Sequence, residues 1–441
     1  MRVEAADGEP GAAHDIGDAR AGDPVGAEEA CGGLEDGREI DRRSGPYVGA
    51  MKRNARLAAA AVVLSVAGLM LWRSGAEGGA WASPSLIAPQ GVGPSNADGP
   101  KVDIVFALDT TSSMGGMIEG AKATIWEIAR KAQEGKPAPQ VRIGLVAYRD
   151  RGDEYVTKVL DLTGDLDLVY AKLTELTANG GGDGPEHVLK GLNDAVNEVH
   201  WSADKRAVKL VYLVGDAPPH EDYDDGLTLN GVLEDARVKG VRVSAIRCGT
   251  DEVTLAKWTM IAGRTDGVVS TIAQNGGVRA AVVTPYDAEL ARLNAELAKT
   301  EIHFGSSAER SAADAVVAAN LAAPPAAQAA RAGFYAAQAH GSGGATKNDL
   351  AAAPMPVAAA VAAVPTAALP EEMQAMSAGE RERFVEKKRA ERESVLAQIK
   401  TANGKRDAAL KAAPKAAAGA AFDDKVLDSL KKAGAESSIV Y

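Results

Sequence analysis

Three short stretches of the sequence carry oxygen ligands of the kind that bind a hard metal ion. The first is Asp109-Thr-Thr-Ser-Ser, in which Asp109, Thr111 and Ser113 alternate and can face one side of a turn. The second is the loop GGGDGPE, whose three glycines before Asp183 allow a close backbone approach, and the third is DAPPH, which begins with Asp216. Carboxylate and hydroxyl oxygens suit Mg²⁺. These five residues therefore predict a site for Mg²⁺, or for another divalent cation such as Mn²⁺ or Ca²⁺.

Each of these residue types also has an ordinary structural role. Ser113 precedes a helical pattern and could be its N-cap, because serine side chains accept hydrogen bonds from the first turn of a helix. Asp216 alone could be a loop aspartate. The metal interpretation is favoured because all three stretches lie where one edge of a sheet is predicted.

The elements that would position these residues alternate between strands and helices. The strand-like runs are almost continuously apolar, as expected when both faces of a strand are covered. Strand, helix and strand at this spacing predict a Rossmann-like, doubly wound α/β fold with a mostly parallel sheet, and such sheets bind ligands at the carboxyl ends of their strands. The predicted strands are 102–108, 141–148, 155–160, 208–215, 241–246 and 267–271, and the predicted helices are 114–132, 166–177, 185–199 and 227–239.

The sequence Asp109-x-Thr111-x-Ser113 resembles the D-x-[ST]-x-S signature of von Willebrand factor type A domains, and Asp216 resembles the third metal loop of that family. The resemblance covers residues 100–285. It implies a metal-ion-dependent adhesion site (MIDAS), in which the hydroxyls of Thr111 and Ser113 bind the cation and Asp109 and Asp216 close the shell. In the family a partner protein fills the open position with a carboxylate. The second loop usually offers a threonine, where this chain has Asp183, so the site would hold its metal well but attract an acidic ligand less.

The expected function is therefore that of a protein-binding module with a divalent-metal-dependent site, and not that of an enzyme. No histidine near a serine or cysteine offers a nucleophile and its base. Hydrolases of the haloacid dehalogenase type place Asp-x-Asp after the first strand, whereas this chain has Asp109-Thr-Thr111. A metal-dependent hydrolase and a non-catalytic subunit of a larger complex are the alternatives.

Composition limits the partners. The chain has 441 residues, a formal net charge of −11 and a pI near 5.2, which disfavours nucleic acid because nucleic acid needs a basic face. The two cysteines, Cys31 and Cys248, lie far apart in segments of different character, so no disulfide framework is predicted. Cys248 follows an apolar strand and is predicted to be a buried thiol.

The N-terminal segment predicts export. Residues 1–50 are acidic and glycine-rich and predict disorder, and Met51 before the basic residues suggests that 1–50 are an over-extended start. Residues 51–82 have the order of a signal peptide, with basic residues, an apolar stretch at 57–72 and Ala-Trp-Ala. The apolar stretch is about 16 residues long, against ~20 for a spanning helix. The alternatives are that this segment is a cleaved signal peptide or a single N-terminal membrane anchor. Either one predicts an exported protein of the periplasm or cell envelope, and the chain resembles exported bacterial proteins with von Willebrand factor type A domains.

The C-terminal third predicts helices and a linker. Residues 286–305 have apolar positions at helical spacing and predict a closing helix on the domain. Residues 306–370 are rich in alanine and proline and predict a flexible or partly helical linker. In the charged tail, 371–441, a capping box at Ser377 opens a helix that is expected to break at Asn403-Gly404. The apolar positions of this helix are sparse for a coiled coil, and an amphipathic helix is predicted at 422–432.

Two further motifs are given ordinary explanations. The tripeptide Arg151-Gly152-Asp153 is an adhesion motif in other contexts, but here it lies between two predicted strands and is typical of a turn. The acidic loop that follows His220 could bind a second cation, although a solvated loop is favoured.

Overall fold

The computed structural model describes residues 79–80, 99–182, 184–274, 283–337, 348–412 and 422–441. The chain divides into two compact units, Met1–Arg73 and Ser74–Tyr441, and all the described residues belong to the second. The predicted disordered segment 1–50 lies outside the described residues, as does the predicted signal or anchor 51–82 except for 79–80. Within the described ranges, every helix is too short or too polar to cross a membrane.

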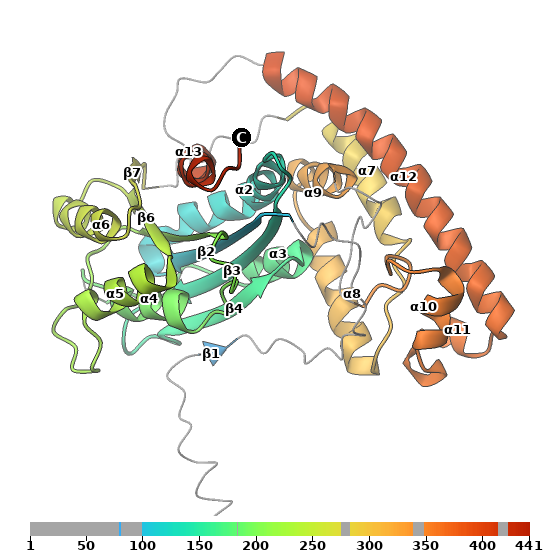
Figure 1. Cartoon of the computed structure of the whole chain (residues 1–441), viewed down its shortest axis with the longest axis horizontal. Coiled ribbons are helices and arrows are strands. Elements are labelled where there is room, and N and C mark those ends of the chain that lie inside the picture. The colour runs from blue at the N-terminus through green and yellow to red at the C-terminus, as the bar shows by residue number, and fades with distance from the viewer. Residues whose placement is uncertain (1–78, 81–98, 183, 275–282, 338–347, 413–421) are drawn as a thin grey trace, which may run out of the picture. The chain divides into compact units, whose positions relative to one another are not determined.

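A seven-stranded sheet forms the centre of the second unit (Figure 1). Its strand order is β1-β4-β3-β2-β5-β6-β7, and every neighbouring pair is parallel except β3 and β4, which run antiparallel. The order reverses at β2, which pairs with β3 on one side and with β5 on the other. The strands are β1 Gly79–Ala80, β2 Lys101–Asp109, β3 Gln140–Tyr148, β4 Thr157–Thr163, β5 Val208–Gly215, β6 Arg242–Cys248 and β7 Val269–Ile272.

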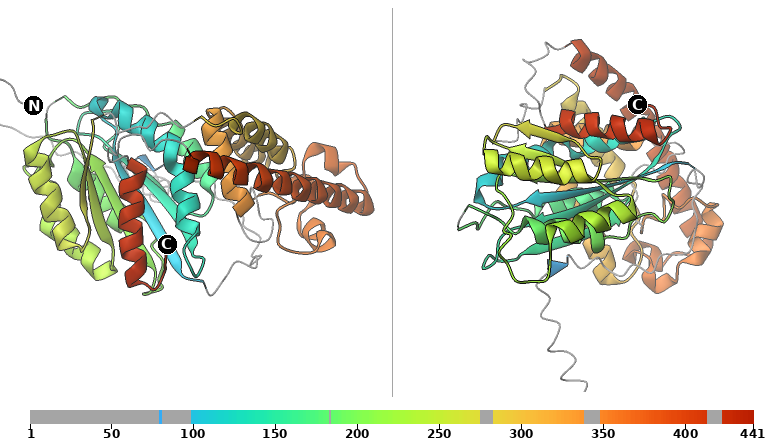
Figure 2. Two further views of the ribbon diagram at one scale, coloured as in Figure 1. Left: turned by 90° about the horizontal axis from the view of Figure 1, so that it is seen from above. Right: turned by 60° about the vertical axis from the view of Figure 1, so that its left-hand side comes forward.

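Helices cover both faces of the sheet because side chains of each strand point alternately to the two faces (Figures 1 and 2). In β2, Phe106 joins the apolar core beneath α2, α3 and α13, whereas Val105 and Ala107 join the core beneath α4, α5 and α6. These helices are α2 Gly115–Gln133, α3 Leu166–Thr174, α4 Val188–Asn197, α5 Leu229–Lys239, α6 Glu252–Arg264 and α13 Phe422–Glu436.

The predicted fold class is confirmed: the sheet is mostly parallel, doubly wound and followed by a helical C-terminal region. The predicted strands at 102–108 and 208–215 agree with β2 and β5 to within two residues. Helix α6 was not predicted, although Asp251 caps it by accepting a hydrogen bond from the backbone N–H of Thr254. Cys248 is buried as predicted, whereas Cys31 lies outside the described residues.

The alanine-rich range 306–370 differs from the predicted linker, because its described part forms packed helices. Small alanine side chains let helices approach closely: α9 contacts both α7 and α2, and α8 contacts α3. Trp126 of α2 fills the junction with α9, where its ring lies 5.6 Å from that of Phe334 and 5.9 Å from that of Tyr335. The helices are α7 Asp287–Ala298, α8 Ser307–Leu321, α9 Pro325–Ala337, α10 Val357–Ala363 and α11 Glu371–Gln374, and the short 3-10 turn η2 spans Thr366–Ala368.

Helix α12, Ala378–Ala412, continues through Asn403-Gly404, where a break was expected. Packing against α7 and α9 explains the difference. Asn403 lies so close to Gly333 of α9 that a Cβ atom on the glycine would be 2.7 Å from its Oδ1 atom. The neighbouring Ala402 is also buried. Tertiary contacts therefore hold a helix that local propensity alone would end.

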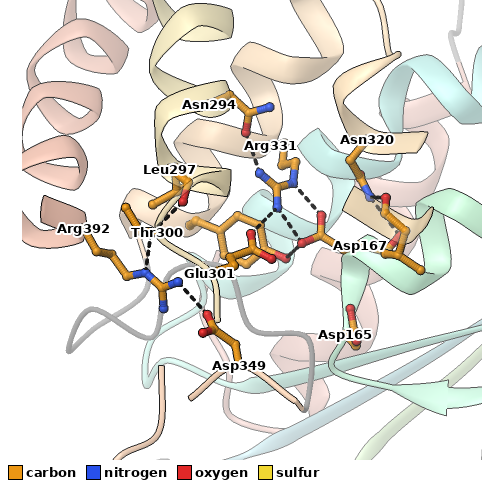
Figure 3. Close-up of polar contacts among 12 residues, drawn as sticks. Asp165, Asp167, Asn294, Leu297, Thr300, Glu301, Asn320, Arg331, Asp349 and Arg392 are labelled. Atoms are coloured by element: carbon orange, nitrogen blue, oxygen red, sulfur yellow. Dashed lines mark hydrogen bonds and ion pairs between the residues drawn. The ribbon is translucent and has the colours of Figure 1, made fainter. Parts of the chain in front are cut away.

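Buried ion pairs join these helices to one another and to the sheet domain. Figure 3 shows Arg331 of α9 between Asp167 of α3 and Asn294 of α7. The guanidinium Nη2 donates to Asp167 Oδ2 at 2.6 Å, and both side chains are almost fully buried. Arg392 of α12 pairs in the same way with Asp349 at 2.5 Å.

Helix α13 returns to the sheet and completes its cover. The hydroxyl of Tyr212 on β5 donates to the carbonyl of Val426 at 2.9 Å, and Ser244 on β6 bonds to Ser429 at 2.8 Å. The ring of Phe422 lies 5.9 Å from that of Phe106 on β2. The last described helix of the chain is therefore part of the core of the sheet domain.

Candidate functional site

The candidate site lies at the carboxyl ends of β2 and β5. Asp109 is the last residue of β2, and Asp216 directly follows β5. Because β2 and β5 are parallel neighbours where the strand order reverses, the topology brings these two carboxylates to the same edge of the sheet.

Asp109 is fully buried, and only one of its carboxylate oxygens has a partner. Oδ1 accepts hydrogen bonds from the backbone N–H of Thr111 at 2.9 Å and from its hydroxyl at 2.6 Å. Oδ2 is buried without a hydrogen-bond partner. Burial raises the pKa of Asp109 to about 7, and the nearby negative charge of Asp216 adds to the rise. The two hydrogen bonds from Thr111 lower this pKa but do not offset the effect of burial. The ionised form of this carboxylate is therefore costly to bury.

The hydroxyls of Thr111 and Ser113 lie 3.4 Å apart, beside Asp109. Ser113 is inside the 3-10 turn η1, Ser112–Met114, which leads into α2. The residue at the N-cap of α2 is Met114, and no side chain caps that helix or η1. Ser113 is therefore not a helix cap, and its hydroxyl remains exposed at the site.

Asp216 lies close enough to act on Asp109 through its charge. Its Oδ2 atom accepts a hydrogen bond from the side chain of Gln274, which follows β7, and its carbonyl accepts one from Thr254 at 3.1 Å. The predicted residues Asp109, Thr111, Ser113 and Asp216 are thus brought to one region. Asp183 lies outside the described residues.

The loop that contains Asp183 brings a different acid to the site. Glu186 is 4% exposed, and its Oε2 atom is buried without a partner. Burial, followed by the charges of Asp109, Asp150 and Asp153, raises the pKa of Glu186 to about 9, and a hydrogen bond with Thr111 opposes the rise. Glu186 ends the loop GGGDGPE but is not among the five predicted ligands.

Two glycines leave the space that these carboxylates occupy. At Gly181, where φ is +75°, a Cβ atom would lie 2.9 Å from Glu186 Oε1 and 3.0 Å from Thr111 Cβ. At Gly215 it would lie 3.2 Å from Asp109 Oδ2 and 2.5 Å from the hydroxyl of Tyr148. Larger residues at either position would push the acids apart.

The turn between β3 and β4 holds the second loop in place. Asp153 accepts a hydrogen bond from the backbone N–H of Gly181 at 3.1 Å. Arg151 pairs with Asp225 at 3.1 Å, and its guanidinium lies 4.0 Å from the ring centre of Tyr223. The tripeptide at 151–153 is therefore used inside the molecule, in agreement with its interpretation as a turn.

The acidic loop after His220 is partly packed rather than fully solvated. The hydroxyl of Tyr223 lies 2.8 Å from both carboxylate oxygens of Asp150, and its ring stacks on His220 at 4.2 Å. His187 Nε2 lies 3.1 Å from Asp225 Oδ2. These contacts fix the loop against the β3–β4 turn and the start of α4.

The donor set fits a hard divalent cation. Across the described ranges, no three His, Cys, Asp or Glu side chains are grouped so that they could hold a metal ion. A cation here would instead need the hydroxyls of Thr111 and Ser113 together with carboxylates, which is the oxygen chemistry that Mg²⁺ prefers. The unpartnered Oδ2 of Asp109 and the space left by Gly215 are consistent with such a ligand.

Comparison with known proteins identifies similarity over the part of the chain that contains the sheet. The sequence model of the von Willebrand factor A domain matches residues 103–278. Similar proteins include the von Willebrand factor A domain-containing protein 7 of rat (35% identical over 124 residues, 28% of this chain and 13% of that protein) and of mouse (34% over 145 residues, 33% and 15%). The chain thus spans less than a sixth of the length of these relatives, which are mammalian, and the expected bacterial origin stays a prediction.

Solved structures with a distant likeness include proximal thread matrix protein 1 from the mussel byssus, with a TM-score of 0.31 and 19% identity over 40% of this chain and 43% of that one. Another is the SpRpn10 VWA domain, with a TM-score of 0.30 and 17% identity over 40% of this chain and 89% of that one.

Proposed function

We propose, from the premise that residues 103–278 form a von Willebrand factor A domain, that this chain is a protein-binding module whose contact with its partner depends on a divalent cation. The observation that carries the proposal is the buried carboxylate of Asp109, whose Oδ2 atom lacks a partner beside two hydroxyls and Asp216. A cation at this edge would supply the missing partner.

The residues that would hold the cation are Thr111 and Ser113 through their hydroxyls, and Asp109, Asp183 and Asp216 through their carboxylates. Mg²⁺ is the preferred ion, with Mn²⁺ or Ca²⁺ as alternatives, because the ligands are all hard oxygens. When bound, the cation would supply positive charge and an open position for an acidic group of a partner protein. The chain itself orients the ligands through the bonds from Thr111 to Asp109.

The partner we propose is a protein that presents a carboxylate. Several acids surround the site, and their negative charges weaken the attraction between the cation and the carboxylate of a partner protein. We therefore expect the partner to bind through a larger surface than one carboxylate, with the cation fixing its position.

The location we propose is outside the cytoplasm, in the periplasm or cell envelope, on the basis of the signal-like sequence at 51–82. Retention of the full chain in the cytoplasm after expression with its own N-terminus, measured by fractionation, would contradict this proposal.

The proposed cation can be tested by thermal unfolding of the full chain with Mg²⁺ and with chelator. A ligand at a hundred times its Kd stabilises the folded state by about 2.7 kcal/mol, which for a domain of this size raises the melting temperature by about 5–10 °C. Wild-type protein should show this rise. Asp109→Ala should lose it, because the cation then lacks its buried carboxylate.

The same proteins test the partner. Capture from the envelope fraction of the source cell should be Mg²⁺-dependent for wild type and absent for Asp109→Ala. Equal melting of wild type and variant in both conditions would rule out the cation, and with it this function.

A further inference from the structure

A cavity of about 580 Å³ lies between α7, α8 and α11, outside the residues that match the von Willebrand factor A domain. Its walls are the end of α7, the loop at 301–303, one face of α8 and the start of α11. Sites for small molecules have volumes of about 300–1,000 Å³. The cavity is therefore large enough for an organic molecule, and the function proposed above does not use it.

Helix α8 lines the cavity along most of its length. The residues on this face recur at three- and four-residue spacing, which places them on one side of the helix. They are Ser307, Ser311, Asp314, Ala318 and Leu321. Another face holds α8 on the sheet domain, because Asn320 donates to the carbonyl of Asp167 on α3 at 3.1 Å. The cavity face is therefore fixed in position, with polar residues toward the start of the helix and apolar residues toward its end.

Glu301 gives the cavity a rigid, buried acid. Its side chain is 2% exposed, and its Oε2 atom lies 3.0 Å from Nε2 of His303. Its Oε1 atom lies 3.5 Å from Nη2 of Arg331, which Figure 3 shows beside Glu301 and paired with Asp167. The other ring nitrogen of His303 lies 2.8 Å from Asp314 Oδ1 on α8. The network that joins the helices thus also positions the acids of the cavity, which lowers the cost of ordering them around a ligand.

Glu371 and Glu372 bring two further acids to the cavity from the start of α11. Both are exposed, and within the described ranges neither side chain takes part in a hydrogen bond or an ion pair. The cations on the walls are His303, which is already engaged by the two other acids, and Arg310, whose guanidinium donates to the carbonyl of Gly305 at 2.6 Å. Acids therefore outnumber cations on the walls, and the space between them is electronegative.

An organic cation suits this cavity better than a metal ion or an anion. The space is many times larger than a metal ion, and among the side chains that the structure describes no group of three is placed to hold one. An anion would be repelled by the surplus of acids, whereas an ammonium group would be attracted. An alkyl chain would cover the apolar end of the cavity, at Ala318 and Leu321.

We propose that this cavity binds a small aliphatic amine. Glu371, Glu372 and Asp314 would accept hydrogen bonds from its ammonium groups, and its alkyl chain would lie against the apolar end of the face of α8. The inference goes beyond the proposed function, because the cavity lies in the helices that follow the sheet and is separate from the edge that would hold a divalent cation.

The test is a calorimetric titration of cadaverine, a five-carbon diamine, into the full chain. The buffer contains chelator, so the result does not depend on the proposed divalent cation. Wild type should bind cadaverine saturably. The neutral five-carbon diol and the five-carbon dicarboxylate glutarate should not bind at the same concentrations. Glutarate binding as strong as that of cadaverine would overturn the assignment of an amine.

The contribution of charge is tested with the double variant Glu371→Gln/Glu372→Gln. It should bind cadaverine about 3- to 30-fold more weakly than wild type, as expected for loss of two exposed ion pairs. The matched control is Glu386→Gln/Glu393→Gln, which removes two exposed charges of α12 that do not line the cavity. It should bind within about twofold of wild type, because distant exposed charges are screened. Equal weakening in both double variants would overturn the site.

The contribution of space is tested with Ala318→Trp, which fills part of the cavity from α8 and should abolish measurable binding. Its control is Ala315→Trp, at an exposed position of the same helix outside the cavity walls, which should bind like wild type. If Ala318→Trp does not melt cooperatively, the charge variants decide. Absence of saturable binding by wild type, or unchanged binding by a folded Ala318→Trp, would overturn the proposal and would leave the proposed function unaffected.

Discussion

Thr111 saturates one oxygen of Asp109 and leaves the other available, which is the central residue-level feature of the candidate site. The alternation of Asp109, Thr111 and Ser113 was visible in the sequence, because the spacing alone places them on one side of a turn. Glu186 was not predicted as a site residue. Its burial depends on backbone bonds to Pro218 and His220, which no local pattern indicates.

A second residue-level environment, at His303, predicts how stability depends on pH. Its ring nitrogens lie 3.0 Å from Glu301 Oε2 and 2.8 Å from Asp314 Oδ1. Burial lowers the pKa of His303, but these bonds and the charges of Glu301 and Asp349 outweigh it and raise the pKa to about 9. Burial also raises the pKa of Glu301, which reduces the gain from the pair.

Because the folded-state pKa of His303 is above its ordinary value of about 6.5, its stabilising effect is complete below pH 6.5 and is lost as the pH rises through about 9. We expect wild type to lose about 1–3 kcal/mol of unfolding free energy over this interval through His303. His303→Gln should show a flatter profile in urea unfolding at pH 6, 8 and 10. Parallel profiles for the two proteins would show that His303 does not titrate as its surroundings predict.

At the scale of elements, contacts between helices determine features that the local sequence does not indicate. The strands were predictable because an apolar run bounded by turn residues is a local feature of the sequence. The continuation of α12 through Asn403-Gly404 was not, since it depends on the contact with Gly333 of α9. Helix was expected in part of 306–370, but its packing was missed for a related reason: alanine and proline composition does not reveal the partner surfaces that these segments cover.

The contact of α4 with β3 gives a test at this scale. A Cβ atom on Gly191 would lie 2.7–2.9 Å from atoms of the buried Tyr148 side chain. Gly191→Ala should therefore lower the free energy of unfolding by about 1–3 kcal/mol through overpacking, although alanine favours a helix by about 1 kcal/mol. Chemical denaturation measures the difference.

The control for this variant is Gly263→Ala in α6, where a Cβ atom would meet no other atom within 4 Å. It should stabilise the protein by up to about 1 kcal/mol through helix propensity alone. A stabilising Gly191→Ala would mean that β3 and α4 can separate without cost.

At the scale of the whole second unit, the sheet domain and the helices after it form one body through buried polar contacts. Arg331, Asp167 and Tyr335 come from α9 and α3, and Tyr335 adds a hydrogen bond to Asp167 at 2.8 Å. The sequence could not indicate this pairing, because its members are separated by more than a hundred residues and each looks like a surface residue in its own helix.

Loss of Arg331 should be among the most destabilising single changes in this unit. Arg331→Met leaves Asp167 buried without its counter-charge, for which a loss of about 3–5 kcal/mol is expected. Arg237→Met removes an exposed pair with Glu234 and should change the free energy of unfolding far less than Arg331→Met does. Urea unfolding compares the two, and equal effects would show that the buried pair does not hold the helices in place.

The position of α13 has a consequence for the order of events during synthesis. Tyr212 meets its partner Val426 across 214 positions of chain. The strands therefore leave the ribosome long before α13, which covers one face of the sheet, is made. In that interval an apolar face of the sheet is exposed to solvent and to other nascent chains. A factor that shields the emerging polypeptide would raise its yield, and residues 103–278 made alone would lack the cover that α13 gives to this face of the sheet.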